Sequence, residues 1–188
     1  MVRTLLLFAM LFQGDAQTSL KPVIDNDRVA VWDVPGPTDA QPLDAVVVSL
    51  SGSAEFLPKG TTPKLAEGKP VGRSIVINLK DHPVAPIANT TGYPLAFPRP
   101  GSKKVLENSR VIVWDYTWTP DVGTPMHFHD KDVVVVFLDD GDLTSTTPDG
   151  KVVVNSFISG MVRFNARDRT HTETLVRGKQ RAIITELK

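Results

Sequence analysis

The fold is indicated by a repeated stretch of sequence, Asn108-Ser-Arg-Val-Ile-Val-Trp-Asp115. It matches the earlier Asn26-Asp-Arg-Val-Ala-Val-Trp-Asp33, with six of eight residues identical. Each copy joins β-branched and aromatic residues to polar ends, which is typical of a strand between turns. Two further pairs of similar blocks follow in the same order. They are Asp44–Val48 with Asp132–Val136, and Gly68-Lys69 plus Arg73–Lys80 with Gly178-Lys179 plus Arg181–Lys188. Three blocks in one order predict two related β units.

The rest of the chain is also rich in short strand patterns. No segment keeps a 3.6-residue apolar period, and Gly, Pro and Asp clusters separate the apolar runs, so the sequence predicts an all-β sandwich or barrel. Pro148-Asp149-Gly150 and Arg177–Gln180 are expected hairpin turns. The expected strands are Arg28–Val34, Ala45–Leu50, Ser74–Leu79, Arg110–Trp118, Val133–Leu138, Val152–Phe157, Met161–Phe164, Thr170–Val176 and Arg181–Glu186.

The first unit is shorter than the second in two places. Asp33 to Asp44 spans 11 positions where Asp115 to Asp132 spans 17, and Gly52 to Gly68 spans 16 where Gly141 to Gly178 spans 37. The longer segments carry histidine, so we expect the chemistry to lie after residue 107. Five prolines between His82 and Pro100 indicate an extended connector between the units.

The first 16 residues have the pattern of a secretory signal peptide. One Arg precedes an apolar run that ends at Phe12, and Gly14-Asp15-Ala16 fits a cleavage site. We therefore expect export to a periplasm or secretion, a truncated β unit with its connector at 17–107, and the second β unit at 108–188. The 188 residues contain no Cys, and 21 basic residues balance 21 acidic ones. Disulfides are excluded, and the zero net charge argues against nucleic acid or membrane as a partner.

Three of the four histidines lie in the second unit. His127 and His129 are two residues apart, so on a strand they point to the same face with Cα atoms about 6.5–7 Å apart. Two imidazoles at that spacing can reach one ion. His171 lies on a later expected strand that pairing can bring opposite them. The three histidines predict a metal site, with polar residues inside a metal-free barrel as the alternative.

The same residues carry a resemblance to a known family. Gly123-Thr-Pro-Met-His127-Phe-His129, followed by an apolar strand and Asp139-Asp140-Gly141, resembles the first motif of the cupin superfamily. Ser159-Gly160, Arg163-Phe164 and His171 resemble its second motif. The resemblance covers about residues 108–188, and residues 26–80 only through the repeat. It implies a cupin-type double-stranded β-helix (jelly roll) at 108–188, a degenerate copy before it in a bicupin-like arrangement, and a divalent metal (Fe, Zn, Mn or Ni) held by the three histidines.

The chain departs from the family at one ligand. Cupins place a glutamate three or four residues after the second histidine, where this chain has Val133 and Val134. Asp132 is one candidate replacement, as a ligand or as a group that orients a histidine, and a solvated charge is its alternative. Glu173 is the other, because it shares a strand face with His171 and is a candidate general acid or base. Its alternative is a rim charge paired with Arg169 or Arg163.

Three functions follow from these observations. The first is a metal-dependent enzyme acting on a small molecule, with dioxygenase-like, hydrolase-like and isomerase-like chemistry all open. The second is a non-catalytic module that binds a metal or a small ligand, for which the missing glutamate argues. The third is a structural exported sandwich without an ion. A second copy of the chain in a homodimer is an additional expected partner.

Overall fold

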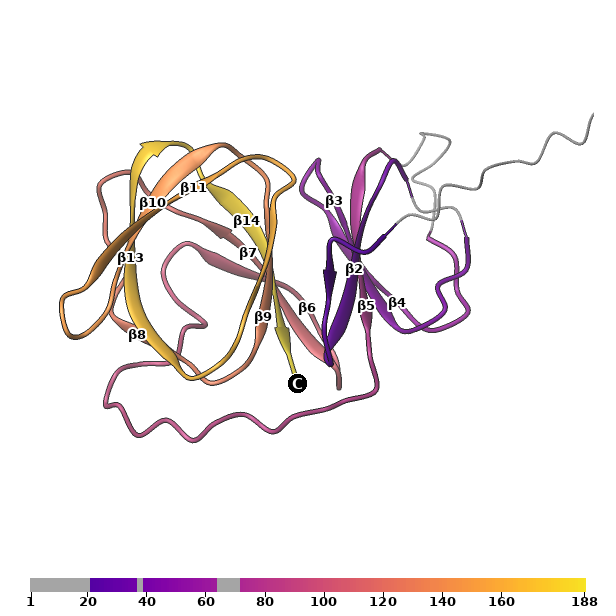
Figure 1. Cartoon of the computed structure of the whole chain (residues 1–188), viewed down its shortest axis with the longest axis horizontal. Helices are drawn as coiled ribbons and strands as arrows, with labels where there is room; N and C mark the ends of the chain where they lie inside the picture. Colours follow the sequence, from indigo (N-terminus) through magenta and orange to yellow (C-terminus); the bar gives the residue numbers. More distant parts are fainter. Residues whose placement is uncertain (1–20, 37–38, 64–71) are drawn as a thin grey trace, which may run out of the picture.

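The protein is built from β-strands alone in the part that the structure describes. The computed structural model describes residues 21–36, 39–63 and 72–188, and every regular element there is a strand (Figure 1). No helix in these ranges has the length and apolar character needed to cross a bilayer. The signal peptide expected at residues 1–16 lies outside the described residues. The all-β fold class is confirmed.

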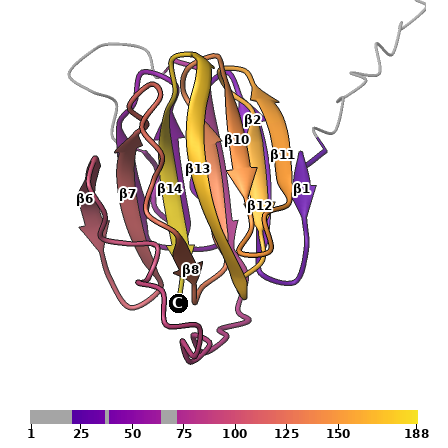
Figure 2. The same cartoon turned by 90° about the vertical axis from the view of Figure 1, so that its left-hand side faces the viewer.

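The C-terminal unit consists of two sheets that face each other across a common interior (Figures 1 and 2). One sheet has the order β12-β9-β14-β7-β6 and the other the order β11-β10-β13-β8. This is a double-stranded β-helix, as predicted. The strands of the first sheet are β6 (Ser102–Glu107), β7 (Val111–Thr117), β9 (Val133–Phe137), β12 (Val162–Asn165) and β14 (Arg181–Leu187). Those of the second are β8 (His127–His129), β10 (Gly141–Thr146), β11 (Val152–Phe157) and β13 (Arg169–Gly178).

One of the two predicted hairpin turns is confirmed. Pro148-Asp149-Gly150 connects the paired strands β10 and β11, and Gly150 has a φ of 82°. Arg177–Gln180 is a turn but not a hairpin, because β13 and β14, which it connects, lie in different sheets. Gly178 in this turn has a φ of 78°. Both angles lie in the left-handed region that glycine adopts without a steric penalty.

The described residues of the N-terminal unit form one five-stranded sheet with the order β1-β2-β5-β3-β4. Its register reproduces that of the β12-β9-β14-β7-β6 sheet residue by residue. Trp32 pairs with Val76 as Trp114 pairs with Ile184, and Val46 pairs with Ile77 as Val134 pairs with Thr185. The strands are β1 (Ile24–Asp25), β2 (Val29–Val34), β3 (Ala45–Ser49), β4 (Ala54–Leu57) and β5 (Ser74–Leu79). The repeat therefore corresponds to one duplicated sheet.

The longer segments of the C-terminal unit contain three of the four strands of its second sheet, β8, β10 and β11. The segment between β7 and β9 holds β8, while β10 and β11 fall before the residue that matches Gly52. That residue is Gly160 and not Gly141, because Gly52 donates its N–H to Ser49 as Gly160 does to the matching Phe137. The glycine spacing used in the sequence comparison was thus out of register. A complete second barrel is not confirmed, and a degenerate cupin origin for the N-terminal sheet stays a prediction.

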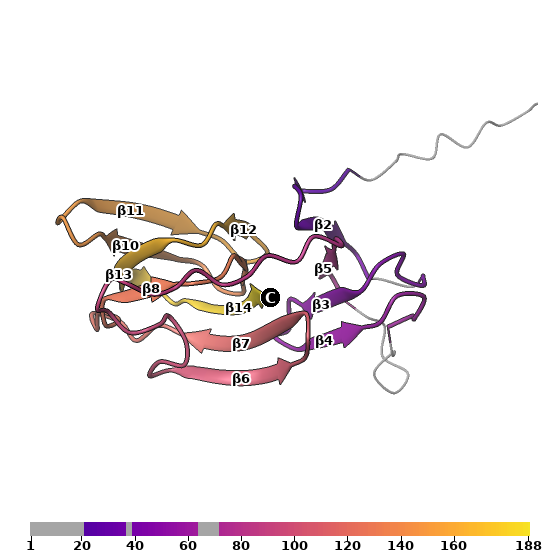
Figure 3. The same ribbon diagram turned by 90° about the horizontal axis from the view of Figure 1, so that it is seen from below.

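The sheet β12-β9-β14-β7-β6 lies in the middle of three layers, with the N-terminal strands beside it on one face (Figures 1 and 3). Alternate residues of β9 serve different cores. Val134 and Val136 pack against the N-terminal sheet, whereas Val133 and Val135 face the barrel interior. Burial on both faces explains why β9 is a continuous apolar run.

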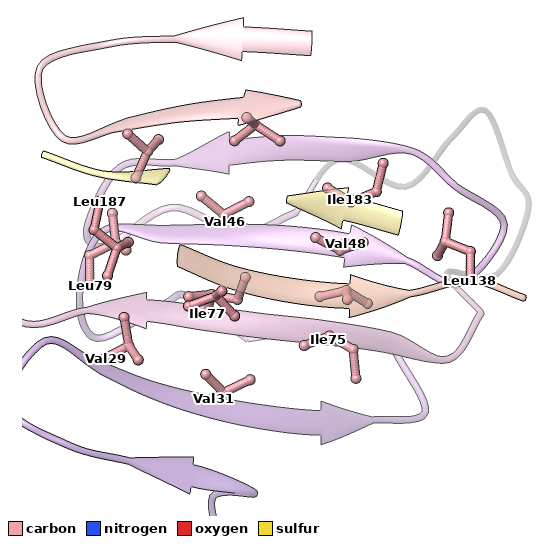
Figure 4. Packing of buried hydrophobic residues seen from close by; sticks show 14 residues of the cluster. Val29, Val31, Val46, Val48, Ile75, Ile77, Leu79, Leu138, Ile183 and Leu187 are labelled. Carbon is pink, nitrogen blue, oxygen red and sulfur yellow. The ribbon is translucent and has the colours of Figure 1, made fainter. Parts of the chain in front are cut away.

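The core between the two units is drawn in Figure 4. Its members come in pairs that the repeat relates, such as Ile75 with Ile183 and Leu79 with Leu187. All four side chains are at most 4% exposed. A shared core of this kind joins the units by hydrophobic burial, which contributes about 25 cal/mol per Å² of apolar area.

Ion pairs at the edge of this core follow the repeat as well. Arg28 of the N-terminal unit pairs with Asp132, and the matching Arg110 of the C-terminal unit pairs with Asp44. The Arg28–Asp132 side chains are 9% and 10% exposed, whereas those of Arg110 and Asp44 are 29% and 27% exposed. The two ion pairs occupy equivalent positions in the repeat but differ in burial.

The proline-rich connector runs beside the C-terminal unit, below it in Figure 1. It attaches to β8: Phe128 donates its N–H to Pro94, and Ala96 donates its N–H back to Phe128. Leu95 and Phe128 form a parallel bridge. The connector thus extends the edge of the four-stranded sheet and brings Phe97 and Arg99 to the barrel interior.

Candidate metal centre

The three predicted histidines meet inside the barrel. His127 and His129 occupy the same face of β8, and β8 pairs with β13 so that His171 lies directly opposite His127. The three side chains are 1%, 6% and 9% exposed. Side-chain alternation on two paired strands therefore produces the cluster, as the spacing predicted.

Two of the distances between the ligand atoms match those around one ion, and the ligand atoms of all three histidines lie within 4.8 Å of one another. Nε2 of His129 lies 3.2 Å from Nε2 of His127 and 3.3 Å from Nε2 of His171. Three nitrogens bound at about 2.1 Å lie roughly 3.0 Å apart in an octahedral face and roughly 3.4 Å apart in a tetrahedron. Neutral imidazole nitrogens are common ligands of Zn, Fe, Cu and Ni. The donor set therefore fits a divalent transition metal.

His127 is held in the tautomer that ligation requires. Its Nδ1–H donates to the carbonyl of Pro125 at 2.7 Å, which leaves a lone pair on Nε2. Nη1 of Arg99 lies 2.7 Å from that Nε2 and donates to it. An ion and this Arg99 contact use the same lone pair, so metal binding requires Arg99 to withdraw. Nδ1 of His129 is buried without a hydrogen-bond partner among the described residues.

The histidines favour the neutral form. Burial, the charge of Arg99 and the neighbouring His171 together lower the pKa of His127 to about 3. Burial likewise lowers the pKa of His129 well below its usual value, with a further contribution from Arg169. The pKa of His171 is lowered by burial, against the opposing charge of Glu173. Neutral imidazole is the form that binds metals.

Glu173 lies beside the cluster. Its Oε1 is 3.9 Å from Nε2 of His171, while its Oε2 accepts from Nη2 of Arg99 at 3.3 Å and from Nε1 of Trp118 at 3.2 Å. Burial raises the pKa of Glu173, but the charge of Arg99 and the nearby histidines outweigh it and the net pKa is lowered. The carboxylate is thus held inside the barrel by Arg99, and not at the rim by Arg169 or Arg163.

Arg99 was not predicted from the sequence. Its side chain is 5% exposed and stacks on two aromatic rings, with Cζ 4.1 Å from the ring centre of Tyr116 and 4.8 Å from that of Phe97. The apolar run Leu95-Ala96-Phe97 just before it is the available signal, because an apolar segment in a connector is expected to be buried. The positions of these residues in the sequence did not indicate which strand Arg99 would contact.

Asp132 is not brought to the histidines. One carboxylate oxygen pairs with Arg28, and the other accepts the N–H of Arg167. Asp132 shares parity with Val134, and that face of β9 packs on the N-terminal unit. Val133, on the barrel face, lines the cavity beside the histidines in the place of a family glutamate. His82 is exposed, also outside the cluster.

A cavity of about 180 Å³ opens beside His129 and His171. Trp118, Phe137 and Phe157 form an apolar wall, and guanidinium groups line other parts of it. Of the alternating aromatic residues on β7, Trp114 is structural, since it stacks on Phe97 and donates to Glu186 at 2.7 Å. The aromatic stripe therefore contributes both to the core and to the cavity wall.

Comparison with known proteins was informative only at the level of three-dimensional structure. No protein-family model and no curated protein matches the chain. A cupin domain from Bordetella pertussis Tohama I is 26% identical, covers 50% of this chain and 99% of its own, and has a TM-score of 0.43. A cupin 2 conserved barrel domain protein from Leptotrichia buccalis is 10% identical, covers 89% and 87%, and has a TM-score of 0.46.

A third similar structure is an RmlC-like cupin family protein with a double-stranded β-helix fold from Methanocaldococcus jannaschii. It is 11% identical, covers 57% of this chain and 91% of its own, and has a TM-score of 0.39. The order of the strands in the two facing sheets gives the C-terminal unit a double-stranded β-helix fold. The motif histidines on β8 and β13 keep their resemblance to those of the cupin superfamily.

Proposed function

We propose that this protein is an exported, metal-dependent enzyme that acts on a small molecule in the barrel of its C-terminal unit. The observation that carries the proposal is the convergence of three Nε2 atoms, at 3.2 and 3.3 Å, from His127, His129 and His171. The described residues supply three buried neutral imidazoles and no fourth ligand, which leaves coordination positions for water or substrate.

When bound, the metal would supply Lewis acidity and lower the pKa of a water or substrate group. Glu173 is the residue that we propose to hold or move a proton. Its Oε2 is fixed by Arg99 and Trp118, and no hydrogen-bond donor within the described residues contacts its Oε1, which is the oxygen nearer the histidines. A carboxylate oriented in this way suits general acid–base chemistry. Dioxygenase-like, hydrolase-like and isomerase-like reactions all remain compatible with these residues.

The second candidate is a non-catalytic module that binds a metal or a small ligand. Val133 favours it, because an apolar residue stands where a ligating carboxylate would face the histidines. The contact of Arg99 with Nε2 of His127 favours it too, since a guanidinium already supplies a cation there. Turnover separates the candidates: an enzyme consumes oxygen or forms product with a small substrate, and Glu173→Gln abolishes this without loss of bound metal.

Metal content tests the site itself. Protein purified without added metal is analysed for transition metals beside His127→Ala/His129→Ala and a control, His82→Ala, whose ring is exposed. We expect up to one ion per chain in the wild type and the control, and none in the double variant. At a free metal concentration of 100 Kd the ion stabilises the fold by about 2.7 kcal/mol. That corresponds to a rise in Tm of roughly 5–11 °C. Absence of uptake by the wild type contradicts the proposal.

Export is tested separately. The pattern at residues 1–16 motivates it, and mass spectrometry of the mature protein from a host with a secretory pathway is expected to show an N-terminus at Gln17. A cytoplasmic product that retains residues 1–16 contradicts export and leaves the metal site unaffected.

A further inference from the structure

The cavity beside the histidines carries more positive charge than the rest of the chain. Arg99, Arg163 and Arg169 line it, and Glu173 is the single carboxylate among the lining residues. The histidines are neutral, so these groups give a net charge of +2 before any metal is bound. The whole chain has a formal charge of zero. The excess of positive charge is therefore local to the cavity.

Two of the three guanidinium groups lack an acidic partner. Arg99 is within 4 Å of Glu173, but no carboxylate of the described residues lies that close to Arg163 or Arg169. Arg169 donates through Nε to the carbonyl of Ala166, whereas its Nη2 is buried without any hydrogen-bond partner in the described part of the chain. Holding an unpaired charge away from water costs free energy. An anionic ligand would offset that cost.

The position of Arg169 points toward the proposed reaction site. On β13 it precedes His171 by two residues, so it faces the same interior, and it pairs across the strands with His129. Arg163 lies on the opposing sheet, on β12, where it stacks over Phe157 and donates to Asn155 at 3.1 Å. The two guanidinium groups thus approach one cavity from two sheets.

The remaining walls are apolar. Trp118, Phe137 and Phe157 share the lining with aliphatic residues of β9 and β14. The volume of about 180 Å³ is close to that of an engineered cavity of about 150 Å³ that holds benzene. A ligand that fits has an apolar body of about one six-membered ring. Inorganic phosphate has no apolar body that could contact these walls.

We infer that the cavity binds a small carboxylic acid, whose carboxylate pairs with Arg169 and Arg163 and whose apolar body contacts the aromatic wall. The inference names the class of substrate for the proposed function, so any reaction of that substrate rests on the proposed metal site. Binding of the carboxylic acid does not require the metal, because neither arginine is a metal ligand. Guanidinium groups bind carboxylates through paired, charge-assisted hydrogen bonds.

The test is calorimetric titration with benzoate, with benzyl alcohol as the uncharged probe of similar shape and inorganic phosphate as the anion without an apolar body. Binding is measured on apo and metal-loaded full-length protein. We expect benzoate to bind at least tenfold more tightly than either of the other two. If benzyl alcohol binds as tightly as benzoate, the cavity does not recognise a carboxylate and the inference is wrong. If phosphate binds as tightly as benzoate, the apolar wall does not contribute to binding and the inference is wrong as well.

Variants assign the effect to the two arginines. Arg169→Gln and Arg163→Gln are each expected to weaken benzoate binding at least tenfold and to leave benzyl alcohol binding unchanged. Arg177→Gln is the matched control, since Arg177 lies on the same strand but is exposed and paired with Asp142. Arg163 is exposed, so its replacement keeps the inference testable if Arg169→Gln does not fold. Benzoate affinity that is unchanged in the folded arginine variants contradicts the inference.

Metal content measured on the same samples separates the two proposals. Metal-loaded protein that does not distinguish benzoate from benzyl alcohol refutes the inference alone. Protein that takes up no metal but prefers benzoate refutes the metal site alone.

Discussion

The two β units share a sheet but not a site. Strands β2, β5 and β3 pair in the register of β7, β14 and β9, and both sheets bury the same alternate residues in one core. Among the described residues, a second sheet is found in the C-terminal unit alone, where it consists of β8, β10, β11 and β13, and β8 and β13 supply all three histidines. The duplicated sheet therefore provides the interface between the units, whereas the candidate chemistry requires the second sheet of the C-terminal unit.

The largest expected difference between equivalent residues concerns the ion pairs at the interface. Arg28→Met leaves the buried Asp132 without its partner, and removing one member of a buried pair costs about 3–5 kcal/mol. Arg110→Met breaks the more exposed pair with Asp44, which is expected to cost about 0–1 kcal/mol. Urea denaturation of both variants measures the two values.

A double variant checks the cause of that difference. Arg28→Met/Asp132→Leu removes both charges and is expected to recover much of the lost free energy of unfolding. Equal losses in the two single variants would mean that burial does not distinguish the equivalent pairs.

Equivalent core residues are expected to have similar effects. Ile75 and Ile183 are both 0% exposed and lie at matching positions of β5 and β14. Replacing either with Ala creates a cavity in the shared core and is expected to cost about 2–5 kcal/mol. Chemical denaturation should show one cooperative transition in both variants. A cost below 1 kcal/mol for Ile75→Ala alone would separate the N-terminal sheet from the core.

A pH dependence that arises in the C-terminal unit is also expected. In the unfolded chain a histidine binds its proton near pH 6.5, whereas folding lowers the pKa of His127 to about 3. As pH falls between these values the unfolded state binds more protons. The free energy of unfolding of the apoprotein therefore decreases, by at most about 1.4 kcal/mol per pH unit for each such group.

His127→Gln is expected to flatten this slope, and His82→Gln, at an exposed position, to leave it unchanged. Denaturation curves at several pH values between 4 and 7 provide the measurement. Identical slopes in the wild type and His127→Gln would contradict the lowered pKa.

Much of the architecture was predictable because it depends on local patterns. Strands with strong apolar or aromatic runs, such as β5 and β11, were located at their observed bounds. The strands that were missed, including β6 and β10, are rich in Lys, Ser and Thr and are recognisable only through their partners. The histidine pair was predictable because alternation on a strand fixes a common face.

The rest of the site depends on contacts between distant segments. The direction of Asp132 follows from the packing of β9 against a second unit, and its parity alone did not indicate which face was the barrel. Arg99 reaches the histidines because the connector pairs with β8, a contact that no local pattern encodes. Long-range pairing of this kind appears only once the chain has folded.

A crystal structure of the metal-loaded protein, with the ion located by anomalous scattering, tests the central claim most directly. We predict one ion per chain, inside the C-terminal barrel, with Nε2 of His127, His129 and His171 as ligands at about 2.0–2.2 Å. An ion whose ligands leave out His171, or barrels without an ion at saturating metal, would contradict the account.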